Sequence, residues 1–278
     1  MRHYRNSLAS RAFSSLLALG AGLSSAGAKA GVGDLLVAPT RVVLESSRGT
    51  EVVLNNIGAD TANYRISLEL RRMKPNGDLE EVPLEQANDH EKKTLEIISY
   101  APRRVTLPPN QPQAIRVGIR NADDLPDGEY RAHMVFRAIP DATPVISTNN
   151  EKALSIKLIP IYGVVIPIII RHGNLQVSAQ ITEAHLEAKA AAGLLDITML
   201  RSGTRSVYGN IRVLHSGVAK PLFEAKGIAV YAEIGQRVVG LPLNAEQTTA
   251  LRGPVTIEYR EPDDLGGGLI SSFQTELR

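Results

Sequence analysis

The stretch LSIKLIPIYGVVIPIIIRHG, residues 154–173, decides between a membrane-spanning chain and a sheet protein. Its central run, Leu158 to Ile170, holds thirteen residues without a charge. As a helix this run would be about 20 Å long, too short for a hydrocarbon core of about 30 Å. Pro160, Gly163 and Pro167 would also interrupt a helix, and the Ile and Val residues favour a strand. Prolines belong at the edges and bends of sheets, so the stretch predicts an edge strand followed by a bend.

The two parts of this stretch have different expected roles. Leu154, Ile156 and Leu158 share one face of the edge strand, because alternate side chains of a strand point the same way. Residues 163–167 predict the crossing between two domains, and residues 168–170 begin the second domain. We therefore expect an exposed strand with an apolar face and a hinge directly behind it.

The rest of the chain consists of short strand-like segments separated by Gly, Pro, Asn and Asp. Residues 64–70 and 115–119 alternate apolar and polar side chains, which turns one face of a strand inward. Pro75 to Asp78 predicts a turn, because Pro fixes φ and the Asn-Gly pair accepts positive φ. Residues 181–192 are the best helical candidate. The many short strands predict an all-β chain of immunoglobulin-like β-sandwiches.

A faint internal repeat indicates two such domains. VVLNNIGADTANYRISL (52–68) is similar to ITMLRSGTRSVYGNIRV (197–213). Each has a strand, a polar turn with a glycine and a second strand that carries a tyrosine. The offset is about half of the chain, as expected for two domains of ordinary size. We predict an N-terminal domain over residues 31–165 and a C-terminal domain over residues 166–278.

Residues 1–30 have the pattern of a signal peptide. Three arginines precede residue 12, an apolar run follows from Phe13 to Leu23, and Ala28-Lys29-Ala30 is a cleavage site of the A-x-A type. The alternative is an uncleaved membrane anchor, but the apolar run is short for a span. The sequence therefore predicts export from the cytoplasm without stable insertion in a membrane.

Removal of residues 1–30 on export would change the net charge of the chain. Four of the 31 Lys and Arg residues and none of the 29 Asp and Glu residues lie in residues 1–30, so 27 basic residues face 29 acidic ones afterwards. A nearly neutral chain does not favour nucleic-acid binding, which depends on clustered Lys and Arg.

A search for catalytic or metal-binding motifs finds little. The chain has no cysteine, so it has no thiol nucleophile or thiolate metal site. The six histidines lack metal-ligand spacing, and no G-x-S-x-G motif occurs. Gly266 to Gly268 predicts a hairpin loop, and the acidic residues between Asp123 and Glu129 predict a solvated loop. We expect neither an enzyme nor a cofactor.

Three passages carry a family resemblance: LLVAPTRVVLESSRGTEVVLNNIGA (35–59), APRRVTLPPNQPQAIRV (101–117) and LPDGEYRAHMVFRAIP (125–140). In this order after an export signal, they resemble the first domain of periplasmic pilus (fimbrial) assembly chaperones of the chaperone–usher pathway, the PapD-like family. The second half is similar more loosely, through LGGGLISSF (265–273). The departures from the family pattern indicate a divergent branch.

The resemblance implies two immunoglobulin-like domains set at an angle, with a cleft between them. It also implies a periplasmic chaperone that lends a β-strand to a pilin subunit until an outer-membrane usher replaces it. An incomplete subunit exposes a sheet edge and an apolar groove, and a donated strand covers both without ATP or metal. When free, the same strand offers an edge for self-association.

The resemblance further implies a basic pair that holds the C-terminal carboxylate of the subunit. Arg41 occupies the place of the family arginine, and a planar guanidinium can bind a carboxylate with two parallel hydrogen bonds. Alignment on Tyr162 puts Ile159 at the place of the family lysine, so Lys157, on the same strand face as Ile159, is the candidate. Leu154, Ile156 and Leu158 are the expected donor residues.

One departure concerns the contact between the domains. Gly163 stands where the family has an arginine, so a charged bridge between the domains is missing or rebuilt, and Arg171 is the available substitute. The alternative function is a secreted or surface-bound structural or adhesive protein of immunoglobulin-like domains. A β-sandwich enzyme is disfavoured by the motif search.

Overall fold

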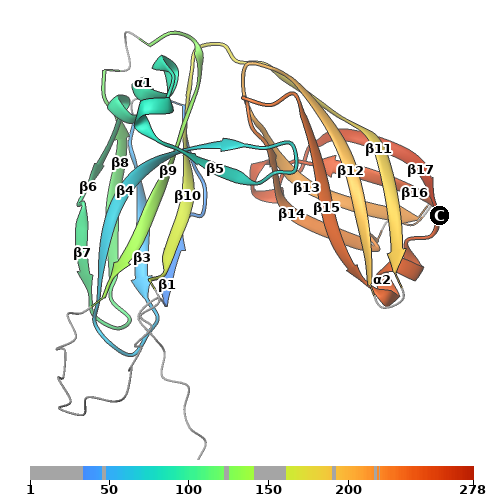
Figure 1. Ribbon diagram of the computed structural model, residues 1–278, viewed down its shortest axis with the longest axis horizontal. Coiled ribbons are helices and arrows are strands. Elements are labelled where there is room, and N and C mark those ends of the chain that lie inside the picture. The colour runs from blue at the N-terminus through green and yellow to red at the C-terminus, as the bar shows by residue number, and fades with distance from the viewer. Residues whose placement is uncertain are drawn as a thin grey trace, which may run out of the picture.

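The computed structural model describes residues 34–45, 48–121, 125–140, 161–189, 192–215, 218 and 220–278. These residues form two β-sandwiches whose long axes are set at an angle (Figure 1). The prediction of an all-β chain with two sandwiches at an angle is confirmed. The predicted signal peptide, residues 1–30, and the predicted donor strand, with Leu154, Ile156, Lys157 and Leu158, lie outside the described residues.

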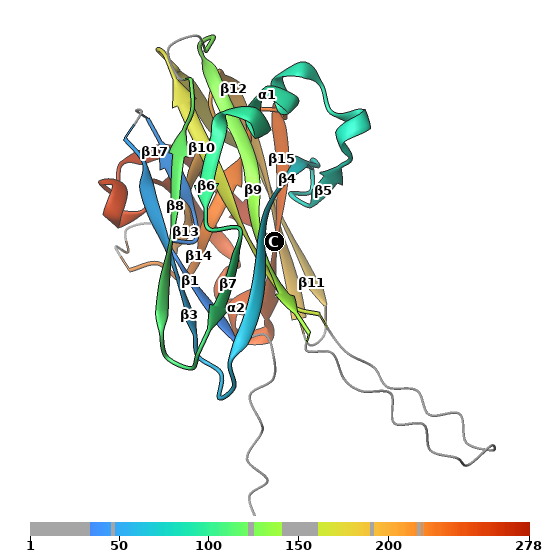
Figure 2. The same ribbon diagram turned by 90° about the vertical axis from the view of Figure 1, so that its left-hand side faces the viewer.

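The first sandwich has two sheets. One sheet, which faces the viewer in Figure 2, contains four strands in the order β1 (Leu35–Ala38), β3 (Thr50–Asn56), β8 (Pro112–Ile119) and β6 (Ile98–Ala101). The other sheet has the order β2 (Val42–Leu44), β10 (Gly163–His172), β9 (Gly128–Ile139), β4 (Ala62–Met73) and β5 (Leu79–Val82), with β7 (Arg104–Leu107) also paired to β4.

The core of this sandwich follows the alternation in the sequence. Tyr64 and Ile66 of β4 face Ile115 and Val117 of β8 across the sandwich interior, and all four are buried in one cluster. The residues between them point out of the sheets, as the period of two requires.

The predicted domain boundary at residues 165/166 is wrong, because it falls inside β10. All of β10 pairs with β9, and residues 168–170 also pair in parallel with β2. Ile166, Ile168 and Ile170 are buried in the core of the first sandwich. On the side that faces β2, the residues of β10 before Ile168 pair with no described strand. Pro167 lies in this unpaired part of β10. The strands of the second sandwich begin only at residue 177.

The second sandwich packs a three-stranded sheet on a four-stranded one. The first has the order β11 (Val177–Lys189), β12 (Ala192–Gly203) and β15 (Gln236–Asn244). The second has the order β14 (Phe223–Val230), β13 (Val207–His215), β16 (Gly253–Arg260) and β17 (Leu269–Leu277). Residues 181–189 of the helical candidate (181–192) belong to strand β11 instead, because β11 pairs with β12 along its length and buries Ile181 and Leu186 in the core.

Two short helices occur among the described residues, α1 (Asp89–Ile97) and α2 (Ala245–Ala250), besides the 3-10 turns η1 (Leu84–Gln86) and η3 (Asp263–Leu265). Both helices begin with a capping box, formed by Asn88 with Glu91 and by Asn244 with Gln247. Within the described part of the chain, neither helix has the length and apolarity needed to cross a bilayer.

The β4–β5 hairpin reaches from the first sandwich to the second (Figure 1). Its tip is the predicted turn: Lys74 N–H donates to the Asp78 carbonyl at 2.8 Å, and Gly77 has a φ of 90°. The Pro75 carbonyl accepts a hydrogen bond from Val238 N–H of β15 at 2.7 Å. A small apolar cluster, Met73 and Ile169 with Ala229 and Tyr231, lies behind the hairpin. The two sandwiches therefore meet through a packed interface.

Candidate functional site

The predicted anchor residue Arg41 lies at the junction of the two sandwiches. It directly precedes β2, and its guanidinium lies 4.5 Å from the ring centroid of Tyr208 and 6.0 Å from that of Tyr231. Both tyrosines belong to the second sandwich. A guanidinium over an aromatic face is attracted by the ring quadrupole. The second sandwich therefore fixes the side chain that the first one supplies.

Arg41 has no anionic partner among the described residues. Its Nη2 is buried without a hydrogen-bond acceptor, and no carboxylate of the described chain forms an ion pair with it. Burial lowers the pKa of the Arg41 guanidinium, against the opposing fields of Tyr231 and Glu129. A buried cation without a counter-charge is costly. This arrangement is suited to receive an anion.

A cavity of about 340 Å³ opens beside Arg41 between the two sandwiches. Its charged lining consists of Arg41 and Arg171 from the first sandwich and Arg205 and Glu261 from the second. Val43, Leu265 and Ile270 supply apolar lining. The cavity therefore combines an excess of positive charge with apolar walls.

Glu129 links the two domains through hydrogen bonds to Ser206. This carboxylate, whose side chain is 1% exposed, accepts hydrogen bonds from Ser206 N–H at 3.0 Å and Ser206 Oγ at 2.9 Å. Arg171 Nε donates to the same oxygen at 3.1 Å, and Arg171 also pairs with Glu45 at 3.5 Å. Both ion-pair partners of Arg171 are carboxylates of the first sandwich, so Arg171 forms no ion pair between the domains among the described residues; it reaches the second sandwich through a hydrogen bond to the Ser206 carbonyl at 3.4 Å.

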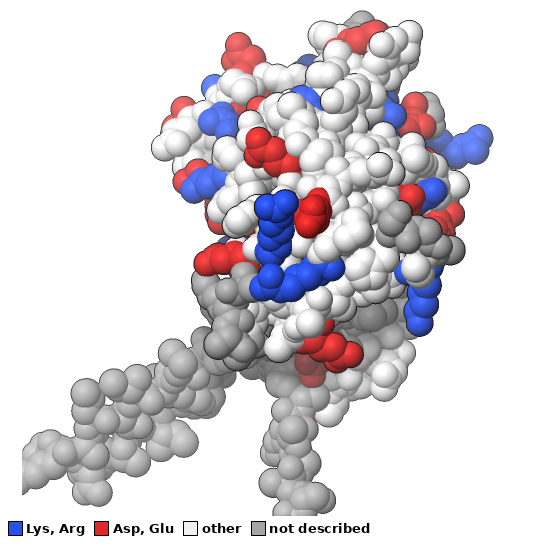
Figure 3. Space-filling model, turned by 90° about the vertical axis from the view of Figure 1, so that its right-hand side faces the viewer, with Lys and Arg blue, Asp and Glu red and all other residues white. Residues whose placement is uncertain are grey.

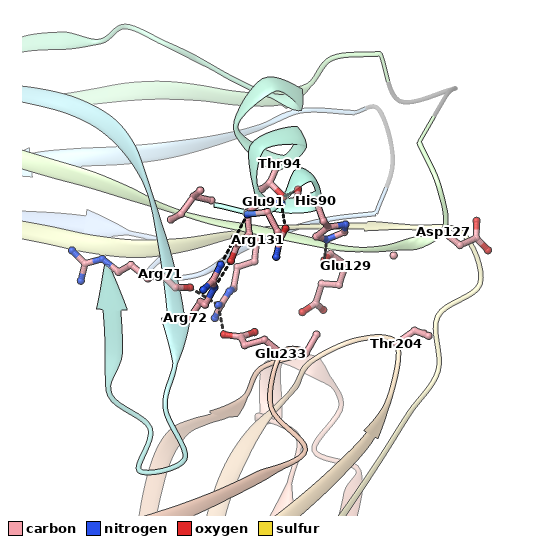
Figure 4. A pocket seen from close by; sticks show the side chains of 14 residues that line it. Arg71, Arg72, His90, Glu91, Thr94, Asp127, Glu129, Arg131, Thr204 and Glu233 are labelled. Atoms are coloured by element: carbon pink, nitrogen blue, oxygen red, sulfur yellow. Dashed lines mark hydrogen bonds and ion pairs between the residues drawn. The ribbon is translucent and has the colours of Figure 1, made fainter. Parts of the chain in front are cut away.

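An interdomain ion pair joins Arg131 of β9 to Glu233 of the second sandwich at 2.5 Å. The same carboxylate oxygen accepts a hydrogen bond from Met73 N–H at 2.8 Å, and the Arg131 guanidinium lies 3.6 Å from the ring centroid of Tyr231. Arg131 and Glu233 line a cavity of about 350 Å³ beneath α1 (Figure 4). Arg72 pairs with Glu91 at 2.7 Å in the same cavity, whereas Asp127 forms no ion pair with a described residue and accepts a hydrogen bond from Asn174 N–H at 3.2 Å.

His133 lies close behind this ion pair and stays neutral. Both of its ring nitrogens are buried without a hydrogen-bond partner, and the ring meets Tyr231 edge-on at 6.3 Å between centroids. Burial lowers the pKa of His133 to about 3, and the positive charges of Arg131, Arg71 and Arg41 act in the same direction. Among the described residues, no three His, Asp or Glu side chains lie close enough together to hold a metal ion.

The described chain resumes shortly after the predicted donor strand. Ile161 and Tyr162 are more than half exposed, and the Tyr162 carbonyl accepts a hydrogen bond from Ala138 N–H at 3.0 Å. A small cavity of about 140 Å³ beside Tyr162 is lined by Leu35, Phe136 and Val164, among others. The first part of β10 is therefore paired on its β9 side and open, among the described strands, on the other.

The sequence indicates Arg41 as the candidate anchor but does not indicate its surroundings. Tyr208 is the tyrosine of the internal repeat in residues 197–213, and nothing in the sequence points to Tyr231 or Arg205. The expectation of a solvated loop at Glu129 is wrong, because β9 carries this residue into the domain interface. The face formed by the second sandwich carries scattered charges of both signs (Figure 3).

No protein-family model matches the chain, and comparison with curated proteins gives no match either. Solved structures are similar to it at low identity. The YadV chaperone matches with 14% identity and a TM-score of 0.46, over 88% of this chain and 100% of that one. The Escherichia coli chaperone DraB matches with 16% identity and a TM-score of 0.44, over 89% and 98%.

A third similar structure is the CsuC–CsuE chaperone–tip adhesion subunit pre-assembly complex from archaic chaperone-usher Csu pili of Acinetobacter baumannii. It matches with 12% identity and a TM-score of 0.45, over 87% of this chain and 97% of that one. All three solved structures contain chaperones.

Proposed function

We propose that the protein is a periplasmic chaperone that binds pilus or fimbrial subunits by lending them a β-strand and delivers them to an outer-membrane usher. The observation that carries this proposal is Arg41, a half-buried cation with a buried, unpaired Nη2 and without an anionic partner among the described residues, at the junction of two β-sandwiches. The sequence resemblance supplies the identity of the missing anion, the C-terminal carboxylate of a subunit. The role requires neither catalysis nor a cofactor.

The open edge next to the anchor supports the same role. The predicted donor strand, with Leu154, Ile156 and Leu158, leads into β10, whose first part has one unpaired edge among the described strands. A subunit strand could add to such an edge through backbone hydrogen bonds, while the alternate apolar side chains fill the groove of the subunit. The carboxylate at Arg41 would then set the register of the added strand.

The proposed organisation places the donor strand and β10 in one N-terminal domain. That domain follows a cleaved signal peptide and ends near residue 172, and the C-terminal domain follows from residue 177. Export to the periplasm fits the predicted signal peptide. The second candidate function is a surface structural or adhesive protein, which needs neither an anion at Arg41 nor a free strand edge.

Co-expression with a pilin subunit tests the proposal. A one-to-one complex should elute from a gel-filtration column, and Arg41→Ala should remove most of it. Arg252→Ala is the matched control, because Arg252 is an exposed arginine of the second sandwich outside both interdomain cavities. Absence of any complex with the unaltered protein would overturn the chaperone function and favour the structural one.

A further inference from the structure

Tyr64 of β4 carries a hydroxyl group that is buried in the first sandwich without a hydrogen-bond partner. The residue is 1% exposed, and its Oη forms no hydrogen bond with any described residue. Tyr259 of the second sandwich is buried as deeply, but its hydroxyl donates to the Ile228 carbonyl at 2.8 Å. A buried hydroxyl without a partner costs free energy, because nothing replaces its hydrogen bonds to water. The Tyr64 hydroxyl is therefore available to a hydrogen-bonding ligand.

Tyr64 lines the cavity of about 140 Å³ at the edge of the first sandwich. Burial raises the pKa of the Tyr64 hydroxyl, and the negative charge of Asp34 raises it further. Because Asp34 directly precedes β1, the hydroxyl lies within the field of that edge of the sandwich. The cavity opens to the surface at Tyr162 and Gly163, which are exposed. Its whole lining is uncharged: Leu35, Tyr64, Phe136, Tyr162, Gly163 and Val164.

This cavity lies beside the open edge of β10. β2 pairs with residues 168–170 only, and residues 163–167 pair with no described strand on that side. β1 belongs to the other sheet, where β3 is its partner among the described strands. Val164 turns inward and packs against the first core. A strand added to the open edge would turn every second side chain inward, next to Val164 and toward the cavity.

We propose that this cavity is a specificity pocket for the strand that adds to β10. It takes one inward side chain that is neutral and carries a hydrogen-bond acceptor, as threonine does, and the Tyr64 hydroxyl donates to that acceptor. The inference rests on the proposed function, in which the added strand belongs to a pilus subunit. Side chains then fill pockets in both directions: the chaperone strand fills the groove of the subunit, and one subunit side chain fills this cavity.

The lining of the cavity decides which side chain it prefers. A charged side chain is disfavoured, because the cavity offers no counter-charge. Valine has the shape of threonine, but it would leave the Tyr64 hydroxyl without a partner. Leu35, Phe136 and Val164 offer apolar contact to the methyl group of threonine. The pocket should therefore prefer threonine to valine, whereas apolar walls alone would prefer valine.

A stability comparison tests whether the hydroxyl is free in the isolated protein. Tyr64→Phe removes only the hydroxyl, so the urea concentration at the midpoint of unfolding should stay the same or rise. Tyr259→Phe is the matched control: it removes the hydroxyl that donates to Ile228, and the midpoint should fall. An equal fall in Tyr64→Phe would show that its hydroxyl is already satisfied, which contradicts the inference.

Two small probes test the preference of the pocket without a pilin. N-acetyl-threonine methylamide and N-acetyl-valine methylamide are neutral, carry backbone amides and differ only by a hydroxyl in place of a methyl group. In nuclear magnetic resonance titrations, the threonine compound should shift the ring signals of Tyr64 and bind at least about threefold more tightly than the valine compound, as expected for one hydrogen bond. Equal or undetectable binding of the two compounds by the unaltered protein would overturn the inference.

Variants link the preference to Tyr64. Tyr64→Phe should lose the preference for the threonine compound, and Tyr259→Phe should keep it. A preference that persists in Tyr64→Phe would mean that another group recognises the probe, and the assignment of Tyr64 would fail. If the preference is found but no pilin forms a complex, the pocket stands and the chaperone function fails. If a pilin forms a complex but neither compound is preferred, the function stands and the pocket fails.

Discussion

Glu129 of the first sandwich is bound to Ser206 of the second through two hydrogen bonds, from Ser206 N–H at 3.0 Å and from Ser206 Oγ at 2.9 Å. The same carboxylate also pairs with Arg171, so one buried oxygen joins three groups. Glu129 therefore stabilises the domain interface. Since Arg41 and Arg205 line a cavity at this interface, Glu129 also helps to fix the position of that cavity.

Replacing Glu129 by Ala should destabilise the protein by about 3 kcal/mol, because it leaves the Ser206 N–H and Oγ without their acceptor and Arg171 without its buried carboxylate partner, with only the exposed Glu45 left to pair with it. The free energy of unfolding in urea measures this effect. Glu276→Ala is the control, since Glu276 forms only an exposed ion pair with Arg278 and its loss should cost less than about 1 kcal/mol. Equal costs for the two variants would contradict the assigned role of Glu129.

Arg41→Met should leave the free energy of unfolding unchanged or raise it by about 1 kcal/mol. The substitution removes a buried charge without an anionic partner and keeps much of the apolar volume. Arg131→Met should have the opposite effect, because it breaks the ion pair with Glu233. Urea unfolding of both variants checks the contrast. A large loss of stability in Arg41→Met would mean that Arg41 serves the fold rather than a ligand.

His133 should make the protein less stable as the pH falls. Its pKa is about 3 in the folded protein and about 6.5 when unfolded, so the unfolded chain takes up the proton first. The stability contribution of neutral His133 is complete above pH 6.5 and is lost between pH 6.5 and 3. The expected slope from this residue is at most about 1.4 kcal/mol per pH unit.

The comparison of wild type with His133→Leu isolates this effect. The variant should show a smaller loss of unfolding free energy between pH 7 and 4, and it costs little at pH 7 because neither ring nitrogen has a hydrogen-bond partner. His185→Leu is the control, since His185 is exposed. Identical pH slopes for wild type and His133→Leu would show that the ring is not buried as described.

The sequence predicted the strands better than the contacts between the domains. The alternation of apolar and polar residues predicted β4 and β8, because one face of each strand is buried in its own sandwich. It misplaced the domain boundary because β10 is apolar on both faces: Ile168 packs in the first core, and Ile169 in the cluster shared with the second sandwich. Resemblance alone indicates Arg41 as the candidate anchor, but the tyrosines that contact it, Tyr208 and Tyr231, lie far along the chain, which no local pattern reveals.

Gly77 at the tip of the β4–β5 hairpin should be sensitive to substitution for two separable reasons. Its φ of 90° disfavours any residue with a Cβ, and an added Cβ would also collide with the Arg237 guanidinium of the second sandwich. Gly253 is the matched control: its φ is 101°, but a Cβ there meets nothing within 4 Å. Both alanine variants should lose about 1 kcal/mol from the backbone conformation.

Only Gly77→Ala should also loosen the docking of the hairpin on β15, which rests on the hydrogen bond between Val238 N–H and the Pro75 carbonyl. Its unfolding free energy should therefore fall further than that of Gly253→Ala, and small-angle X-ray scattering should show a larger radius of gyration. If the two variants lose the same stability and scatter alike, the hairpin does not hold the sandwiches at their angle, and the packed cluster of Met73, Ile169, Ala229 and Tyr231 would have to do so alone.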